Sequence, residues 1–213
     1  MKKVEYSLII DDNSVYFKKY LNLIKTTVDN DNEKYKTEEK RVRGVMSEES
    51  DKSVINEGED YLAYMELEIS ETEQLMYRSF VISTYVFMEA KITSLCVYAE
   101  GYFEQIFSHK DISGRGVGRS IKYIEKVFGE NFPSTQPFKF KFEIAQKIRN
   151  ALVHNEGIIK DEDKPKVNEF IRKYPGVLEI NSTGEIKITY NYAKDMVSLN
   201  KDICKEISRM WKC

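Results

Sequence analysis

Residues 75–106 read LMYRSFVISTYVFMEAKITSLCVYAEGYFEQI, and this stretch decides the fold because its apolar residues recur at the spacing of a long α-helix. Three apolar rows run along that helix. The first row is Leu75, Ile82, Cys96 and Phe103, the second is Tyr85, Ile92, Ala99 and Ile106, and the third is Met76, Phe80, Phe87, Ala90 and Val97. Apolar rows on more than one side predict a helix in the middle of a bundle, or one that also meets a partner subunit.

One charged residue interrupts the first row. Glu89 stands where the heptad spacing requires an apolar side chain, and a carboxylate in an apolar seam costs free energy unless it is paired. It can fix the register of the helix by bonding to a neighbouring tyrosine or lysine. Alternatively, it can orient the residues of a functional site, and the sequence leaves both interpretations open.

The chain before this helix divides into two parts. Residues 14–28 carry apolar side chains on one helical face after Asn13, a plausible N-cap, and predict a first helix. Residues 29–60 carry dense mixed charge, two glycines and almost no apolar periodicity, which predicts a long loop or a poorly ordered insertion. Such a segment is usually only solvated, and a docking arm is the alternative. From residue 61 we expect a shorter helix and then the long one, from about residue 70 to residue 107.

Shorter elements follow the long helix. Helices are predicted at about residues 120–128, 137–154, 163–173 and 192–211, and a β-hairpin at residues 177–190 around the turn Asn181-Ser182-Thr183-Gly184. The last helix should turn Ala193, Met196, Leu199, Ile203, Ile207 and Met210 inward. The predicted fold is therefore one mostly all-α domain over residues 1–213, a helical bundle with a long central helix and a small β-hairpin between the last two helices.

The composition is that of a soluble globular protein, with 41% hydrophobic residues, 32% charged residues and a formal net charge of -2. Any RNA site must therefore be a local basic patch. Cys96, Cys204 and Cys213 are odd in number and far apart, which indicates reduced thiols rather than disulfides or a zinc site. The most apolar run, residues 80–88, is far shorter than the roughly 18 residues that span a bilayer. We expect a cytoplasmic protein with no membrane partner.

A second stretch carries the candidate chemistry. Residues 148–157 read IRNALVHNEG and place Arg149 five residues before His154, one of only two histidines in the chain. A guanidinium can bind a phosphate with a planar fork of donors, and an imidazole exchanges protons near neutral pH. The pair could therefore cleave RNA. Alternatively, both are polar residues at a helix end, with Arg149 in a salt bridge and His154 favoured by the helix dipole.

The segment Arg149-Asn150-Ala151-Leu152-Val153-His154 resembles the R-N-x-x-x-H signature of the HEPN (higher eukaryotes and prokaryotes nucleotide-binding) superfamily. The order of elements over about residues 70–211 is similar too. The resemblance implies an all-α bundle that dimerises, with two copies of the motif in one cleft cleaving RNA without a metal ion and leaving 2′,3′-cyclic phosphate ends. Such proteins serve as toxins or antiviral effectors. In one branch a tyrosine two residues after the histidine is nucleotidylated, but Glu156 stands here, so that regulation is not expected.

The chemistry of the residues gives compatible roles. His154 would be general base or acid for attack of the RNA 2′-hydroxyl, and Arg149 would stabilise the charge that grows on the phosphate. Being five positions apart on one helix, the two do not share a face, and a second subunit would supply groups from across the cleft. Asn150 could hydrogen-bond the ring of His154 and fix its tautomer. Glu89 and Asn155 are the other supporting candidates.

A glycine-rich basic loop, SGRGVGRS at residues 113–120, is the candidate for RNA contact. It lacks the third glycine of the dinucleotide-binding motif and the Gly-Lys-Ser/Thr of a P-loop. Backbone N–H groups at the start of the next helix, together with Arg115 and Arg119, could grip a phosphate. Lys147 would add basic charge on the motif helix. A plain flexible connector is the alternative.

Three classes of function remain open. The first is a metal-independent endoribonuclease, a homodimer with RNA as its substrate and no cofactor. The second is a non-catalytic HEPN-like module that binds RNA or protein in a toxin–antitoxin or defence assembly, with an antitoxin or regulatory protein as partner. The third, a small-molecule nucleotide binder, depends on the glycine-rich loop and the superfamily name. A metal-dependent nuclease is not favoured, because no clustered carboxylates or histidines stand out.

Overall fold

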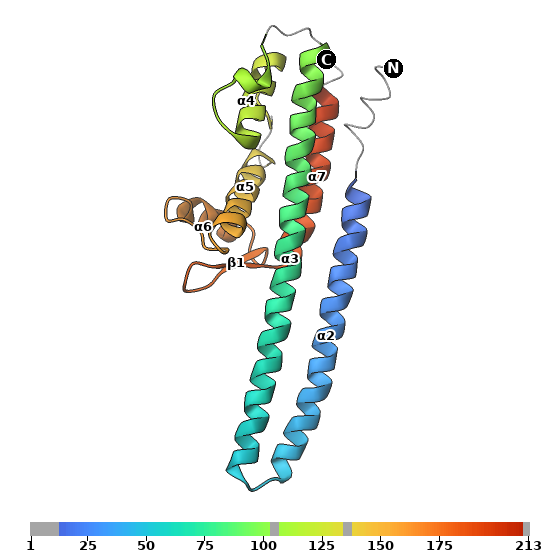
Figure 1. The fold of residues 1–213 in the computed structure, drawn as a ribbon, viewed down its shortest axis with the longest axis vertical. Helices are drawn as coiled ribbons and strands as arrows, with labels where there is room; N and C mark the ends of the chain where they lie inside the picture. Colours follow the sequence, from blue (N-terminus) through green and yellow to red (C-terminus); the bar gives the residue numbers. More distant parts are fainter. Residues whose placement is uncertain (1–12, 103–106, 134–137, 211–213) are drawn as a thin grey trace.

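The computed structural model describes residues 13–102, 107–133 and 138–210, which are mostly helical (Figure 1). The elements are α2 (Ser14–Glu48), α3 (Lys52–Tyr102), the 3-10 turn η1 (His109–Asp111), α4 (Gly116–Phe128), α5 (Phe138–His154), α6 (Lys164–Lys173), β1 (Leu178–Ile180), β2 (Ile186–Ile188) and α7 (Tyr190–Met210). The two strands pair antiparallel, with Glu179 opposite Lys187. The predicted fold class, a mostly helical bundle with a small hairpin, is confirmed.

Helix α3 is the centre of the molecule. It contacts α2 and α7 on one side and α4, α5 and β2 on another, and Figure 1 shows α2 beside its lower half and α4, α5 and α7 beside its upper half. Its fully buried side chains include Phe80, Val81, Met88, Ile92 and Leu95. Burying an apolar side chain of this size stabilises a fold by about 1.5 to 3 kcal/mol, so this helix organises the core.

Residues 29–48 and 52–60 are helical, and the prediction of a long loop there was wrong. Helix α2 continues to Glu48, and α3 begins at Lys52 and runs without interruption, so no separate short helix precedes it. The dense charge forms ion pairs along α2, such as Lys25–Asp29, Arg41–Glu38 and Arg43–Glu39, at the three- and four-residue spacings that stabilise an exposed helix. We call residues 29–73 the arm; Figure 1 shows it projecting beyond the hairpin.

A glycine allows the two helices of the arm to pack closely. A Cβ atom placed on Gly58 would lie 2.6 Å from the sulfur of Met46 and 3.4 Å from a methyl carbon of Val42. Glycine costs about 1 kcal/mol relative to alanine inside a helix, and here the close approach of α2 and α3 explains it. The same residue looked like a loop signal in the sequence.

The apolar rows of α3 are buried only in part. Tyr85, Ile92 and Ala99 are buried as predicted, whereas Leu75 and Val97 are 67% and 55% exposed. Ala90 is also exposed, and Phe103 and Ile106 lie outside the described residues. Leu75, Val86 and Val97 recur every 11 residues, close to three helical turns, and lie on one side of α3 that we call its outer face. Within the described chain no element covers these three side chains.

Helix α3 also contains an 18-residue window with a mean hydropathy of 1.4, long and apolar enough to cross a membrane by those two criteria alone. About 44% of that window is buried in the structure. The core helix of a soluble protein passes the same test, and α3 has the packing of such a helix. This is therefore no clear signal of a membrane protein.

The later elements agree closely with the sequence patterns. α7 buries the inward row predicted for it, and α5 ends at His154 as expected. Helix α4 begins four residues earlier than predicted, at Gly116 instead of Ser120. Cys96 and Cys204 are buried and form no disulfide, and Cys213 lies outside the described residues.

Candidate active site

The motif lies at the C-terminal end of α5, where the helix leaves the core. The buried face of α5 is Phe138, Phe142, Ile144, Ala145, Ile148 and Ala151. This face holds the helix against the bundle and leaves Arg149 half-buried, with Asn150 and His154 exposed. The helical period therefore presents the motif side chains to solvent.

The turn after His154 is attached to the hairpin. The N–H of Ile158 donates to the carbonyl of Asn155 at 2.8 Å, and the two residues between them, Glu156 and Gly157, have positive φ angles of 52° and 87°. This is the signature of a type I′ turn. The N–H of Gly157 donates to Ala151, and its carbonyl accepts from the N–H of Ile186 in β2. Asn155, a predicted supporting residue, thus contributes through its backbone.

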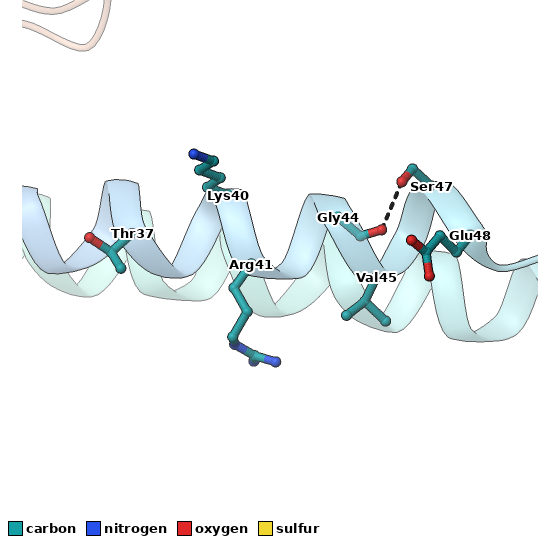
Figure 2. Close-up of a pocket in the computed structure, with 7 residues that line it drawn as sticks. All are labelled: Thr37, Lys40, Arg41, Gly44, Val45, Ser47 and Glu48. Carbon is teal, nitrogen blue, oxygen red and sulfur yellow. Dashed lines mark hydrogen bonds between the residues drawn. The ribbon is translucent and has the colours of Figure 1, made fainter.

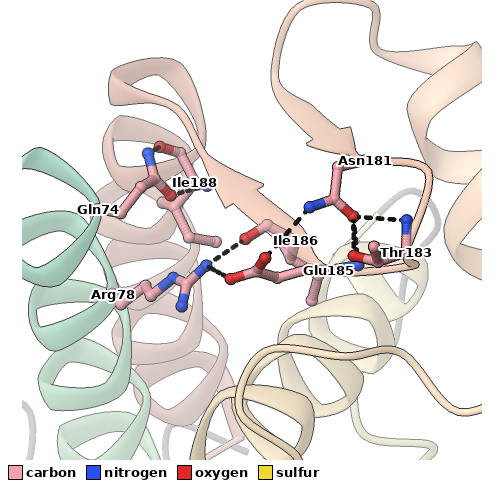
Figure 3. Close-up of polar contacts among 7 residues, drawn as sticks. All are labelled: Gln74, Arg78, Asn181, Thr183, Glu185, Ile186 and Ile188. Carbon is pink, nitrogen blue, oxygen red and sulfur yellow. Dashed lines mark hydrogen bonds and ion pairs between the residues drawn. The ribbon is translucent and has the colours of Figure 1, made fainter. Parts of the chain in front are cut away.

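Arg78 of α3 lies against this turn and bonds the hairpin beside it. Its Nη2 donates to the Glu185 carboxylate at 2.7 Å and to the carbonyl of Ile186 at 3.0 Å (Figure 3). A Cβ atom on Gly157 would lie 3.4 Å from Nη1 of Arg78, so the missing side chain leaves room for the guanidinium. The hydrogen bond from Arg78 is the largest cause that holds the pKa of Glu185 below its usual value. The turn, the hairpin and α3 are therefore one connected unit.

Arg149 and His154 approach each other within one chain. Nη1 of Arg149 lies 3.5 Å from Nε2 of His154, and the same nitrogen donates to Oδ1 of Asn150 at 3.1 Å. The expectation that five positions would separate the two side chains was wrong, because the long arginine side chain reaches along the helix end. Asn150 was expected to bond the His154 ring; its side-chain oxygen instead accepts from Arg149.

Tyr85 forms the floor under Arg149, and the sequence did not reveal it. The guanidinium carbon lies 5.9 Å from the centre of the Tyr85 ring, which stacks on Phe142 at 6.1 Å. Tyr85 is only 2% exposed, and burial raises the pKa of its phenol far above the usual value; nearby Glu89 adds to this and Arg149 opposes it. Tyr85 is thus a neutral platform. Within the described chain, its hydroxyl and Nε of Arg149 are buried without a hydrogen-bond partner.

Glu89 of α3 contacts the backbone at the start of α4. Its Oε1 accepts the N–H of Val117 at 3.0 Å, and a Cβ atom on Gly116, which has a φ of 54°, would lie 3.0 Å from the same oxygen. Within the described residues Glu89 forms no hydrogen bond or ion pair with a tyrosine, a lysine, Arg149 or His154; its hydrogen-bond partner is the backbone of Val117. A carboxylate at the start of a helix satisfies a backbone N–H group that has no partner within the helix. The carboxylate of Glu89 therefore also explains why α4 begins earlier than predicted.

The three predicted RNA-binding residues have different surroundings. Lys147 forms an ion pair with Asp163, and the side chains are 27% and 22% exposed, so it ties α5 to the start of α6 instead of facing a ligand. Arg119 donates from Nε to the carbonyl of Gly114 at 3.0 Å and closes the glycine-rich loop. Arg115 is exposed at the N-cap of α4. The two arginines keep their charge available, whereas Lys147 does not.

Outside the motif, one surface depression among the described residues has a charged lining. A depression at the end of α2 is lined by Thr37, Lys40, Arg41, Gly44, Val45, Ser47 and Glu48. Figure 2 shows the charged ends of Lys40 and Arg41 pointing to opposite sides of the helix, so they do not converge on a ligand. In the described part of the chain, no three His, Cys, Asp or Glu side chains gather as metal ligands would.

No family model, curated protein or solved structure matches this chain. Its function has to be inferred from the residues of the site.

Proposed function

We propose that the protein is a metal-independent endoribonuclease, related to the HEPN superfamily, that uses Arg149 and His154. The observation that carries this proposal is the 3.5 Å approach of Arg149 Nη1 to His154 Nε2 at an exposed helix end. An arginine can only donate, so in this contact Nε2 carries a lone pair. A lone pair on an exposed imidazole, beside a phosphate-binding guanidinium, supplies a general base and charge stabilisation for RNA transphosphorylation.

The reaction would follow from this geometry. The phosphate oxygens take the donors of Arg149, which releases Nε2 of His154 to accept the proton of the ribose 2′-hydroxyl. The 2′-oxygen forms a bond to phosphorus, and the bond from phosphorus to the 5′-oxygen breaks. One product ends in a 2′,3′-cyclic phosphate and the other in a 5′-hydroxyl. The departing 5′-oxygen takes a proton from the His154 of a second subunit, which must start as the imidazolium and ends neutral, while the first His154 ends protonated.

The proposed dimer has support in the outer face of α3. Leu75, Val86 and Val97 are 67%, 47% and 55% exposed on one side of the longest helix. A second copy of the chain packing there would remove this apolar surface from water. We place the protein in the cytoplasm, as a toxin or antiviral effector that a regulatory protein can neutralise.

The test is cleavage of single-stranded and structured RNA by purified protein in the presence of a chelator. We expect cyclic phosphate ends from the wild type and a loss of at least about a hundredfold in rate for His154→Ala. The matched control is His109→Ala, which removes the other histidine of the chain. His109 pairs with Glu100 through Nδ1 at 2.6 Å and is 9% exposed, away from the motif.

Two outcomes would contradict the proposal. RNA that stays intact with folded wild-type protein would favour the non-catalytic RNA- or protein-binding module. Cleavage that His154→Ala leaves unchanged would point to a contaminating nuclease. Oligomeric state by light scattering tests the dimer separately, and a monomer at micromolar concentration would argue against it.

A further inference from the structure

Helix α4 carries an unbroken row of positive charge. Arg115 at its N-cap is followed by Arg119, Lys122 and Lys126, at spacings of four, three and four residues. The helical spacing places Arg119, Lys122 and Lys126 on one face of α4, and Arg115 stands at the N-cap before them. The opposite face, Val117, Ser120, Tyr123 and Ile124, is buried, so the row lies on the side of α4 turned away from the core. We call these four residues the basic track.

The charges of the basic track are not neutralised by the protein. No carboxylate lies within 4.0 Å of any of its four cationic groups among the described residues, whereas Lys141, Lys147 and Lys166 of α5 and α6 are each paired with an acid. Arg119 donates to a carbonyl, and Lys126 lies 4.5 Å from the ring of Phe107. Both contacts orient a side chain without cancelling its charge. The row spans residues 115–126, 11 steps along the chain, or about 16 Å at the rise of a helix.

The track begins close to the candidate site. Glu89 of α3 holds the N–H of Val117 at the start of α4, and Tyr85, one helical turn earlier on α3, lies under Arg149. From there α4 runs along α3 in the same direction, because Ser120 meets Thr93 and Cys96. The basic track therefore leads away from the level of Arg149 along the upper half of the molecule.

We propose that the basic track binds the phosphate backbone of an RNA strand, and this inference rests on the proposed function for the site at its lower end. The track presents evenly spaced cations on an open surface, with no buried polar group or apolar pocket beside them. Such a surface suits the evenly spaced phosphates of a nucleic acid strand. Contacts of this kind position the strand without reading its bases. The track would hold the RNA on one side of the scissile phosphate. Binding there is independent of sequence, and selectivity arises elsewhere.

The experiment measures RNA affinity as a function of salt, with His154→Ala in every protein to prevent cleavage. The full-length chain with Lys122→Gln and Lys126→Gln is compared with the parent on a labelled single-stranded RNA. The control pair is Lys194→Gln and Lys201→Gln, two exposed lysines of α7 with no ion pair among the described residues. Each phosphate contact contributes about 0.7 to the slope of log affinity against log salt for a single strand, so the track variant should lose about 1.4. The control should keep the parental slope.

An unchanged slope in the folded track variant would overturn the inference. So would a variant that binds RNA normally but loses salt-dependent self-association, since the track would then be a protein-binding surface. Cleavage by the wild type separates the two hypotheses. If RNA is cleaved but the slope does not change, only the basic track is wrong; if the slope changes and no RNA is cleaved, only the proposed chemistry is wrong.

Discussion

At the scale of single residues, the turn after His154 contains one unfavourable backbone conformation. Glu156 has a φ of 52°, which side-chain-bearing residues adopt at a cost of about 1 to 2 kcal/mol. Gly157 adopts a φ of 87° without that cost, because it has no Cβ atom. The surrounding contacts, with Ala151, Ile186 and Arg78, hold both residues in place. The strain lies two residues from His154 and fixes where the chain leaves the motif helix.

Opposite effects are therefore expected from two neighbouring substitutions. Glu156→Gly should stabilise the fold by about 1 kcal/mol, because glycine accepts the positive φ. Gly157→Ala should destabilise it by more than about 1 kcal/mol, because its φ is positive and its Cβ would meet the Arg78 guanidinium at 3.4 Å. Urea unfolding followed by circular dichroism measures both. Equal effects of the two substitutions would mean that the turn has a different conformation in solution.

At the scale of elements, the sequence predicts well what depends on local pattern. The end of α5, the hairpin and the inward row of α7 follow from periodicity and turn residues, and Arg149 and His154 could be found by their spacing. Contacts between distant segments could not be read in this way. In the sequence Tyr85 is only one more residue of an apolar row, and its contact with Arg149 of α5 appears only in the structure. Glu89 is a misfit in the sequence, and only the structure shows that it accepts the N–H of Val117 in α4. The helical arm was missed because ion pairs and the packing of α2 on the first part of α3 support it, and neither gives an apolar period in the sequence.

Besides Arg78, one buried amide side chain of α3 attaches the hairpin to that helix. Gln74 is 7% exposed; its Nε2 donates to the carbonyl of Ile188 at 3.1 Å, and its Oε1 accepts the N–H of the same residue at 2.8 Å (Figure 3). Gln74→Leu fills a similar volume but leaves both backbone groups of Ile188 without their partner. We expect a loss of at least about 2 kcal/mol in thermal or urea unfolding. Thr72→Gln, at an exposed position of α3 two residues earlier, is the control and should change stability by less than about 0.5 kcal/mol.

At the scale of the whole molecule, a near-neutral chain is divided into two regions of opposite charge. The arm contains 15 acidic and six basic residues, a net charge of -9, and the rest of the chain contains 20 acidic and 27 basic residues, a net charge of +7. The formal net charge of -2 conceals this division. At the root of the arm, Glu66, Glu68, Glu71 and Glu73 follow one another on α3 with no lysine or arginine between them. The acidic root precedes Arg78 and the motif turn, and the basic track lies beyond them.

This division of charge should determine which way a bound RNA strand runs over the protein. An RNA strand held at Arg149 is repelled by the acidic root and attracted along the basic track, so removing acid at the root should strengthen binding. We expect Glu68→Gln with Glu71→Gln to raise RNA affinity severalfold at low salt, and the gain should vanish near 1 M salt, where the screening length falls to about 3 Å. The control, Glu48→Gln with Glu57→Gln, removes the same charge near the tip of the arm; on α3, Glu57 lies about 16 Å from Glu68. It should leave affinity unchanged at physiological salt, where the screening length is about 8 Å. Equal gains from both pairs would show that the arm acts through its total charge, and no gain from either would show that RNA does not pass near its root.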